Sequence, residues 1–259
     1  DVVIYVKGGS VRVHGVYNGT YSIVTDEYVV YRRHATKWLF GSNEMVPRDT
    51  LWGNIWLTGD IINADAYPSG NMEPYQPDES CEEDNGSKNI LGLVSGANVI
   101  VANSKDNGAH NNYWDEGIKI NAGIVALNES FVVHYWQNTL SGNFGAPPCC
   151  EQYSQPPYGD GRGKERLHGN PPPPLPGTSG SDLRGTIYFW GSLVQKHRGY
   201  VVRNPPGSYG NASVGYPEKD YHYDRNMNCT PPPFYPALEY AGTNEIDVTV
   251  KDYQKVRNN

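Results

Sequence analysis

The residues with the clearest chemical potential lie near the end of the chain. Asp220, His222 and Asp224 alternate with Tyr221 and Tyr223. In an extended strand, residues two apart share one face, so the two carboxylates and the imidazole would point the same way. Such a group could bind zinc or another divalent cation, or orient an acid-base histidine. The alternative is a polar cap whose acids are neutralised by nearby cations. Apart from this candidate cation, no cofactor is expected.

A second group of acids lies in a polar stretch around Cys81. Calcium takes oxygen ligands, but the spacing of these acids does not fit an EF-hand loop. A solvated loop tied down by Cys81 is the alternative. The acids are Asp78, Glu79, Glu82, Glu83 and Asp84.

Residue types suited to glycoside chemistry are present but scattered. Enzymes that act on acidic polysaccharides gather carboxylates and a base on one face. Asp115 and Glu116 precede a strand-like unit, whereas Arg166 and His168 lie in a proline-rich stretch. A phosphate-binding glycine loop, a GxSxG nucleophile and an HExxH zinc motif are all missing from the sequence. We therefore predict that the protein is not an enzyme.

The four cysteines point to disulfides and an exported protein. They occupy loop-like segments without a CxxC spacing, which favours disulfides over a zinc site. Cys149 and Cys150 could bridge to Cys81 and Cys229, but spacing leaves the pairing open. Asn-x-Ser/Thr sequons are also compatible with an extracellular surface. These glycosylation candidates are Asn18, Asn85, Asn128, Asn211 and Asn228.

Composition predicts strands and loops rather than helices. The chain has 259 residues, with 29 Gly, 20 Pro and 20 Tyr, and only 19% of its residues are charged. A net charge of -7 argues against nucleic acid as a partner, because phosphate-backbone binders need clustered Lys and Arg. No apolar run approaches the roughly 20 residues of a spanning helix, so we expect no membrane span in this sequence.

A short pattern recurs along the chain and indicates half-buried strands. Each copy reads apolar, any, apolar, any and then a small residue. Uneven spacing between copies is explained if loops are inserted at corners. We predict an all-β fold: a single short right-handed parallel β-solenoid (β-helix) with large Pro/Gly-rich loop insertions. A two-sheet sandwich is the alternative. The copies are VRVHG from Val11, IWLTG from Ile55, LGLVSG from Leu91, IKINAG from Ile118 and LRGTIYFWGSLVQKHRGY from Leu183.

The same alternation predicts a core and a domain plan. Residues 1–236 would form the solenoid, with loops inserted at about 34–52, 64–89, 103–116 and 137–182. Residues 237–259 would form a C-terminal extension and a candidate subunit-contact strand. Because the sequence opens on a strand-like segment without a start Met, we expect a processed or truncated chain. The predicted core comprises Leu91, Leu93, Val99, Val101, Ile118, Ile120, Ile124, Ala126, Phe131 and Val133.

Four segments carry a resemblance to a known family. LGLVSGANVIVAN, IKINAGIVALNESFVV, LRGTIYFWGSLVQKHRGYV and GYPEKDYHYDRNMNCTPPPFYP occur in that order. From about Val11 to Pro236 the chain resembles an uncharacterised bacterial β-helix domain of PilX-like type IV pilus assembly proteins. The resemblance implies export and attachment to a pilus or cell surface, and it carries over no catalytic residue. The chain departs from the family by lacking the N-terminal pilin-like helix, by a larger proline-rich insertion and by its C-terminal tail.

These observations favour a structural role outside the cell. We expect a pilus-associated or self-assembling filament subunit whose loops serve adhesion or subunit contact. Its strand-like ends, DVVIYV and EIDVTV, are candidate exchange elements, because an unpaired strand edge can pair with another chain. A carbohydrate-binding or carbohydrate-active protein is the alternative, since exposed aromatic rings stack on sugars. Arg184, Lys196, His197 and Arg198 are expected to pair with the acids of the DYHYD segment.

Overall fold

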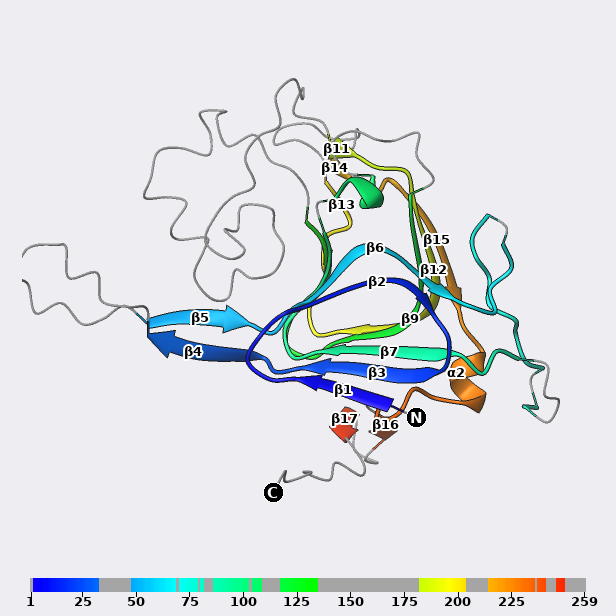
Figure 1. Cartoon of the computed structure of the whole chain (residues 1–259), viewed down its shortest axis with the longest axis horizontal. Helices are drawn as coiled ribbons and strands as arrows, with labels where there is room; N and C mark the ends of the chain where they lie inside the picture. The colour runs from blue at the N-terminus through cyan, green and yellow to red at the C-terminus, as the bar shows by residue number, and fades with distance from the viewer. Residues whose placement is uncertain are drawn as a thin grey trace, which may run out of the picture.

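We describe the protein from a computed structural model. It covers residues 2–32, 48–68, 70–78, 80–81, 86–102, 104–108, 117–134, 182–203, 214–235, 237–240 and 246–249. Strands dominate these residues, and their helices are limited to a short 3-10 turn and one turn of α-helix. Ten strands form one sheet that curves around a buried core (Figure 1).

The strands and the two short helices follow one another along the chain. In order, they are β1 (Val2–Val6), β2 (Val11–Tyr17), β3 (Thr20–Thr25), β4 (Tyr28–Arg32), β5 (Arg48–Trp52), β6 (Ile55–Asn63), β7 (Ile90–Ser95), β8 (Val99–Val101), η1 (Lys105–Asn107), β9 (Ile118–Ala126), β10 (Phe131–Val133), β11 (Asp182–Leu183), β12 (Thr186–Gln195), β13 (Val202–Arg203), β14 (Val214–Gly215), β15 (Glu218–Tyr223), α2 (Asn226–Cys229), β16 (Ala237–Tyr240) and β17 (Ile246–Thr249).

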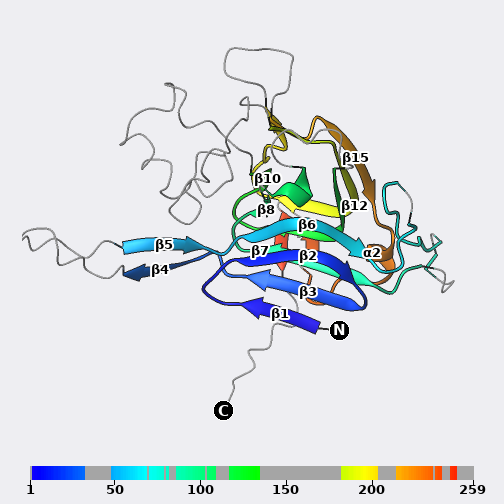
Figure 2. The same cartoon turned by 45° about the horizontal axis from the view of Figure 1, so that its top comes forward.

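Every pairing within the ten-stranded sheet is parallel. One ladder runs through β1, β3, β7, the C-terminal half of β9 and the C-terminal half of β12. A second runs from β2 through β6, β9 and β12 to β15, and a third joins β2, β6, β8 and β10. The long strands β6, β9 and β12 therefore pair with different neighbours in their two halves. Figure 2 shows β1 at one side of the sheet, with β12 and β15 toward the other.

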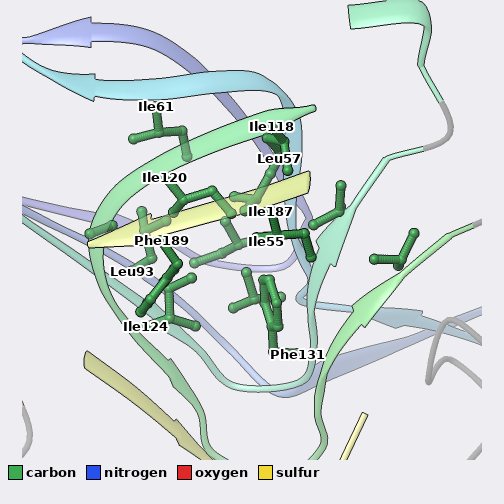
Figure 3. Packing of buried hydrophobic residues seen from close by; sticks show 14 of the residues in the cluster. Ile55, Leu57, Ile61, Leu93, Ile118, Ile120, Ile124, Phe131, Ile187 and Phe189 are labelled. Carbon is green, nitrogen blue, oxygen red and sulfur yellow. The ribbon is translucent and has the colours of Figure 1, made fainter. Parts of the chain in front are cut away.

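The core lies between these ladders and confirms the predicted buried set. All ten predicted core residues are at most 4% exposed. Side chains from β6, β7, β9, β10 and β12 meet in one cluster (Figure 3). Burying a side chain of this size contributes about 1.5–3 kcal/mol, so this cluster supplies the main driving force for the fold.

Buried asparagine side chains hold the backbone where strands begin. Asn54, Asn98 and Ser130 lie directly before β6, β8 and β10. Asn54 Oδ1 accepts hydrogen bonds from the backbone nitrogen of Asn98 at 3.0 Å and from its Nδ2 at 3.1 Å. Asn98 Oδ1 accepts one from the backbone nitrogen of Ser130 at 3.3 Å. These contacts satisfy polar backbone groups that would otherwise be buried without partners.

The predicted right-handed parallel β-solenoid is wrong. The recurring units do form parallel strands, but these strands belong to a single sheet that stays open. Antiparallel pairs lie outside that sheet: β4 with β5, β13 with β14 and β16 with β17. β5 also falls within the loop predicted for residues 34–52. Alternation specifies which face of a strand is buried, but not which strands become neighbours or whether the sheet closes.

Candidate functional site

The candidate site lies where β15 pairs with β12. β15 runs parallel to residues 186–191 of β12, which places Tyr188 opposite Asp220 and Trp190 opposite His222. On its other side, β12 pairs with β9 over residues 187–195. Among the described strands, β15 has no second neighbour, so it forms an edge of the sheet.

Two of the three predicted metal ligands meet on the outer face of this edge. His222 Nε2 and Asp220 Oδ1 lie 2.6 Å apart, and their side chains are 39% and 37% exposed. The imidazole stacks on the indole of Trp190, with ring centroids 4.2 Å apart and planes inclined by 13°. A carboxylate contact orients an imidazole ring and selects its tautomer. The pair is nevertheless open to solvent, unlike the enclosed clefts in which most small ligands bind.

Asp224, the third predicted ligand, lies apart from this pair. It follows β15, is 2% exposed, and its Oδ1 accepts hydrogen bonds from Gln76 Nε2 at 3.1 Å and Asn226 Nδ2 at 2.7 Å. Burial raises the pKa of this carboxyl group, and the hydrogen bonds from Asn226 and Gln76 act in the opposite direction. Among the described residues, no three His, Cys, Asp or Glu side chains form a group that could hold a metal ion. Asp224 therefore anchors the chain after β15.

A broad, open hollow lies beside the His–Asp pair. Its volume is about 380 Å³, and its walls come from Phe189 and residues 191–194 of β12 and residues 221–223 of β15. Phe189 and Tyr221 are in tilted ring contact, with centroids 5.7 Å apart. Burial raises the pKa of Tyr221 to about 12, so its hydroxyl group stays neutral at physiological pH. The walls are thus mainly apolar and aromatic.

The hollow borders a strand edge that the sequence analysis did not identify. β15 covers β12 only as far as Gly191, so residues 192–195 have a neighbour, β9, on one side alone within the described strands. The edge arises because β12 has ten residues and β15 only six, so β15 cannot cover the full length of β12.

One disulfide lies close to the site. Cys81 is bonded to Cys229, with Cα atoms 5.4 Å apart and 148 residues of sequence separation. It ties the polar stretch before β7 to α2, directly after β15. This pairing contradicts bridges from Cys149 and Cys150 to these two cysteines; Cys149 and Cys150 themselves lie outside the described residues.

Three of the five sequons fall within the described residues. Asn18 and Asn228 are exposed, whereas Asn128 is half-buried and its Nδ2 donates a hydrogen bond to the carbonyl of Gly96 at 2.9 Å. Asn228 Oδ1 accepts a hydrogen bond from the hydroxyl of Tyr223 at 2.6 Å. Glycosylation at these positions stays a prediction. Asn85 and Asn211 lie outside the described residues.

The predicted pairing of basic residues with the DYHYD acids is wrong. Arg184 is fully buried, and its guanidinium donates to the carbonyls of His134 at 2.8 Å and Ala102 at 3.3 Å. Lys196, His197 and Arg198 are exposed. In the described part of the chain, the basic residue that contacts one of those acids is His222, at 2.6 Å from Asp220.

The remaining candidate groups lie mostly beyond the described residues. Asp78 is described, and its carboxylate accepts a hydrogen bond from the hydroxyl of Ser80 at 3.0 Å. The other acids of that stretch and the scattered glycoside-type residues are not placed, namely Glu79, Glu82, Glu83, Asp84, Asp115, Glu116, Arg166 and His168.

Wider comparisons leave the site as the main guide to function. Within the described residues, no helix combines the length and apolar character needed to cross a membrane. Comparison with protein-family models, with curated proteins and with solved structures finds no match to this chain. The resemblance to PilX-like proteins therefore stays a prediction.

Proposed function

We propose that this protein is a structural surface protein whose copies associate through the open edges of the ten-stranded sheet. The observation that carries the proposal is the exposure of β1. Val2, Val3, Ile4 and Tyr5 are 47%, 37%, 46% and 45% exposed, and β1 pairs with β3 alone among the described strands. An apolar strand at the edge of a sheet is a template for another chain, and soluble monomers usually protect such edges.

The second open edge supports the same role. Residues 192–195 of β12 end the ladder that β1 begins, and the hollow beside them is lined by apolar and aromatic side chains. β1 and β12 contain no proline. The neighbouring edge strand β15 carries the charged residues Glu218 and Lys219, and charges of this kind limit non-specific pairing.

The setting that fits this role is extracellular, at the cell surface. The Cys81–Cys229 disulfide supports export, because disulfides persist in oxidising compartments. A pilus or another surface filament is the assembly we propose, with pilus components as further partners. The family resemblance favours the same setting.

Carbohydrate binding is the second candidate function. Tyr221 and Tyr223 are 43% and 49% exposed beside the hollow, where their rings could stack on sugars. A glycan array with the full chain would test this role. Carbohydrate binding would be favoured over self-association if the parent chain stays monomeric and binds a glycan. That binding should be lost in the double variant Tyr221→Ala and Tyr223→Ala.

Self-association is tested by measuring mass against protein concentration. Light scattering after size exclusion should show species larger than the monomer as concentration rises, and electron microscopy should show filaments. Ile4→Lys should raise the concentration needed for association at least about tenfold, because a charged group then replaces apolar contact worth about 1.4 kcal/mol or more.

Leu127→Lys provides the matched control. Leu127 is 38% exposed and follows β9, a strand with neighbours on both sides, so the same change away from the open edges should leave association unaltered. The proposed function would be refuted if the unmodified chain stays monomeric at every concentration. It would also be refuted if Ile4→Lys and Leu127→Lys weaken association equally.

A further inference from the structure

The two open edges belong to the two ends of one parallel ladder. Its five strands are β1, β3, β7, β9 and β12, in that order. β1 and residues 192–195 of β12 each lack a second neighbour among the described strands, and the sides concerned face opposite ways along the same stack. A second copy shifted along the stack would present its β1 to β12 with the same strand direction.

The register of this contact follows from the pairings already present. One row across the ladder contains Ile4, Ile23, Leu93, Ile124 and Leu193. Ile23 and Leu193 are partly buried against the core, and Leu93 and Ile124 are fully buried. The next copy would therefore continue an apolar row already directed toward the core.

A second row supports the same register on the opposite face. It contains Tyr5, Val24, Val94, Val125 and Val194. Val94 and Val125 are 3% exposed, while the two ends of the row, Tyr5 and Val194, are 45% and 37% exposed. Exposure of this row is thus greatest at the two edges that a neighbouring copy would cover.

We propose that residues 3–6 of β1 in one copy pair in parallel with residues 192–195 of β12 in a second copy, with Ile4 opposite Leu193 and Tyr5 opposite Val194. The inference rests on the proposed self-association and specifies its interface. Ile4 would then enter the hollow that Leu193, Phe189 and Tyr221 line. The two strands would then join through main-chain hydrogen bonds, as in other cases of strand addition.

A second ladder can continue under the same shift. There, Gly15, Ile61, Ile120, Phe189 and Tyr221 form one row, from β2 to β15. Continuing that row places Gly15 of the second copy opposite Tyr221.

The same shift predicts an open filament rather than a closed ring. One kind of edge meets the other kind, so the contact is heterologous and repeats without limit when no rotation closes it. Five strands spaced about 4.8 Å apart give an axial repeat of about 24 Å. Electron microscopy can measure that repeat directly.

A disulfide cross-link tests the register. Tyr5→Cys and Val194→Cys are prepared as separate variants, mixed and oxidised. Strand neighbours spaced about 4.8 Å lie within the 4.4–6.8 Å range of Cα separations in disulfides. The mixture should yield a bond between the two introduced cysteines, identified by peptide mapping, whereas each variant alone should not. Because Tyr5 donates a hydrogen bond to Asp26, circular dichroism of the first variant confirms that it is folded.

A charge change provides an independent test that strengthens the contact. One residue beyond the paired strands, the register brings Lys7 of one copy beside Lys196 of the other, and like charges opposite each other are unfavourable. Lys196→Glu should lower the concentration needed for association about two- to fivefold. Lys105→Glu makes the same change in net charge at an exposed residue of η1 and should have no such effect.

The outcomes separate this inference from the proposed function. Filaments that form without the mixed cross-link, or with cross-links between two copies of the Tyr5→Cys variant, would overturn the register while self-association stands. Monomers at all concentrations would overturn both. Filaments that contain the mixed cross-link and respond to Lys196→Glu would establish the interface.

Discussion

Replacing Gly191 with alanine should destabilise the protein at the junction between its two open ladders. Gly191 is the last residue of β12 covered by β15, and it lies opposite Ala122 of β9. A Cβ atom at this position would lie 1.9 Å from the carbonyl oxygen of Ala122 and 3.2 Å from Cζ of Phe189. The first neighbour is backbone within a ladder and cannot move independently of it.

The size of the effect follows from that distance. Real Cβ atoms essentially never approach a heavy atom closer than 3.0 Å, so β9 and β12 would have to separate locally by about 1 Å. Overpacking of this kind costs about 1–3 kcal/mol, and a weakened ladder hydrogen bond adds about 0.5–1.5 kcal/mol. We expect a loss of about 2–4 kcal/mol in the free energy of unfolding, a large share of the roughly 5–15 kcal/mol typical of a folded domain.

Urea unfolding followed by tryptophan fluorescence measures this loss. With a slope of about 2 kcal/mol per molar urea, the midpoint should fall by about 1–2 M. Gly9→Ala is the matched control, because a Cβ there would meet no heavy atom within 4 Å. If the two variants differ by less than about 0.5 kcal/mol, the close approach of β9 and β12 at Gly191 is refuted.

Three further predictions concern the disulfide, two tyrosines with raised pKa values and the buried arginine. Cys229→Ser should lower the free energy of unfolding by about 2–4 kcal/mol, because the unfolded chain loses a cross-link, and urea melts of the parent chain and the variant measure this loss. Burial raises the pKa values of Tyr221 and Tyr235 to about 12 from 10.0, so their contribution to stability is complete below pH 10 and is lost as pH rises toward 12. The free energy of unfolding from urea melts should therefore decline between pH 8 and pH 12. An equal decline in a variant with Phe at both positions would contradict this prediction. Arg184→Met should cost about 2–5 kcal/mol, because two buried carbonyls lose their donor, and near-parental stability in calorimetry would show that water replaces it.

Local alternation of residue types was enough to predict the strands and the core. Each of the five recurring units contributes a strand to the main sheet, and the ten predicted core residues are buried. A side chain's burial depends first on which face of its own strand it occupies, and this face alternates with every residue. That information is present in a few consecutive residues.

The arrangement of those strands could not be predicted in the same way. The solenoid prediction failed because the same alternation fits any sheet with a buried face, whereas closure depends on contacts between distant segments. Asp224 shows the same limit within the site. Its spacing from His222 suits a shared strand face, but β15 ends at Tyr223, and Gln76, 148 residues upstream, binds the Asp224 carboxylate instead.

For this protein, then, the sequence alone determined which residues are buried, where strands occur and that β1 carries an apolar edge. Only the tertiary structure decided that residues 192–195 of β12 form the opposite edge among the described strands, that Asp220 and His222 meet on Trp190 and that Cys81 pairs with Cys229. Strand faces are set by neighbouring residues, whereas edges and side-chain meetings are set by which distant segments pair, and that choice depends on the packing of the whole sheet.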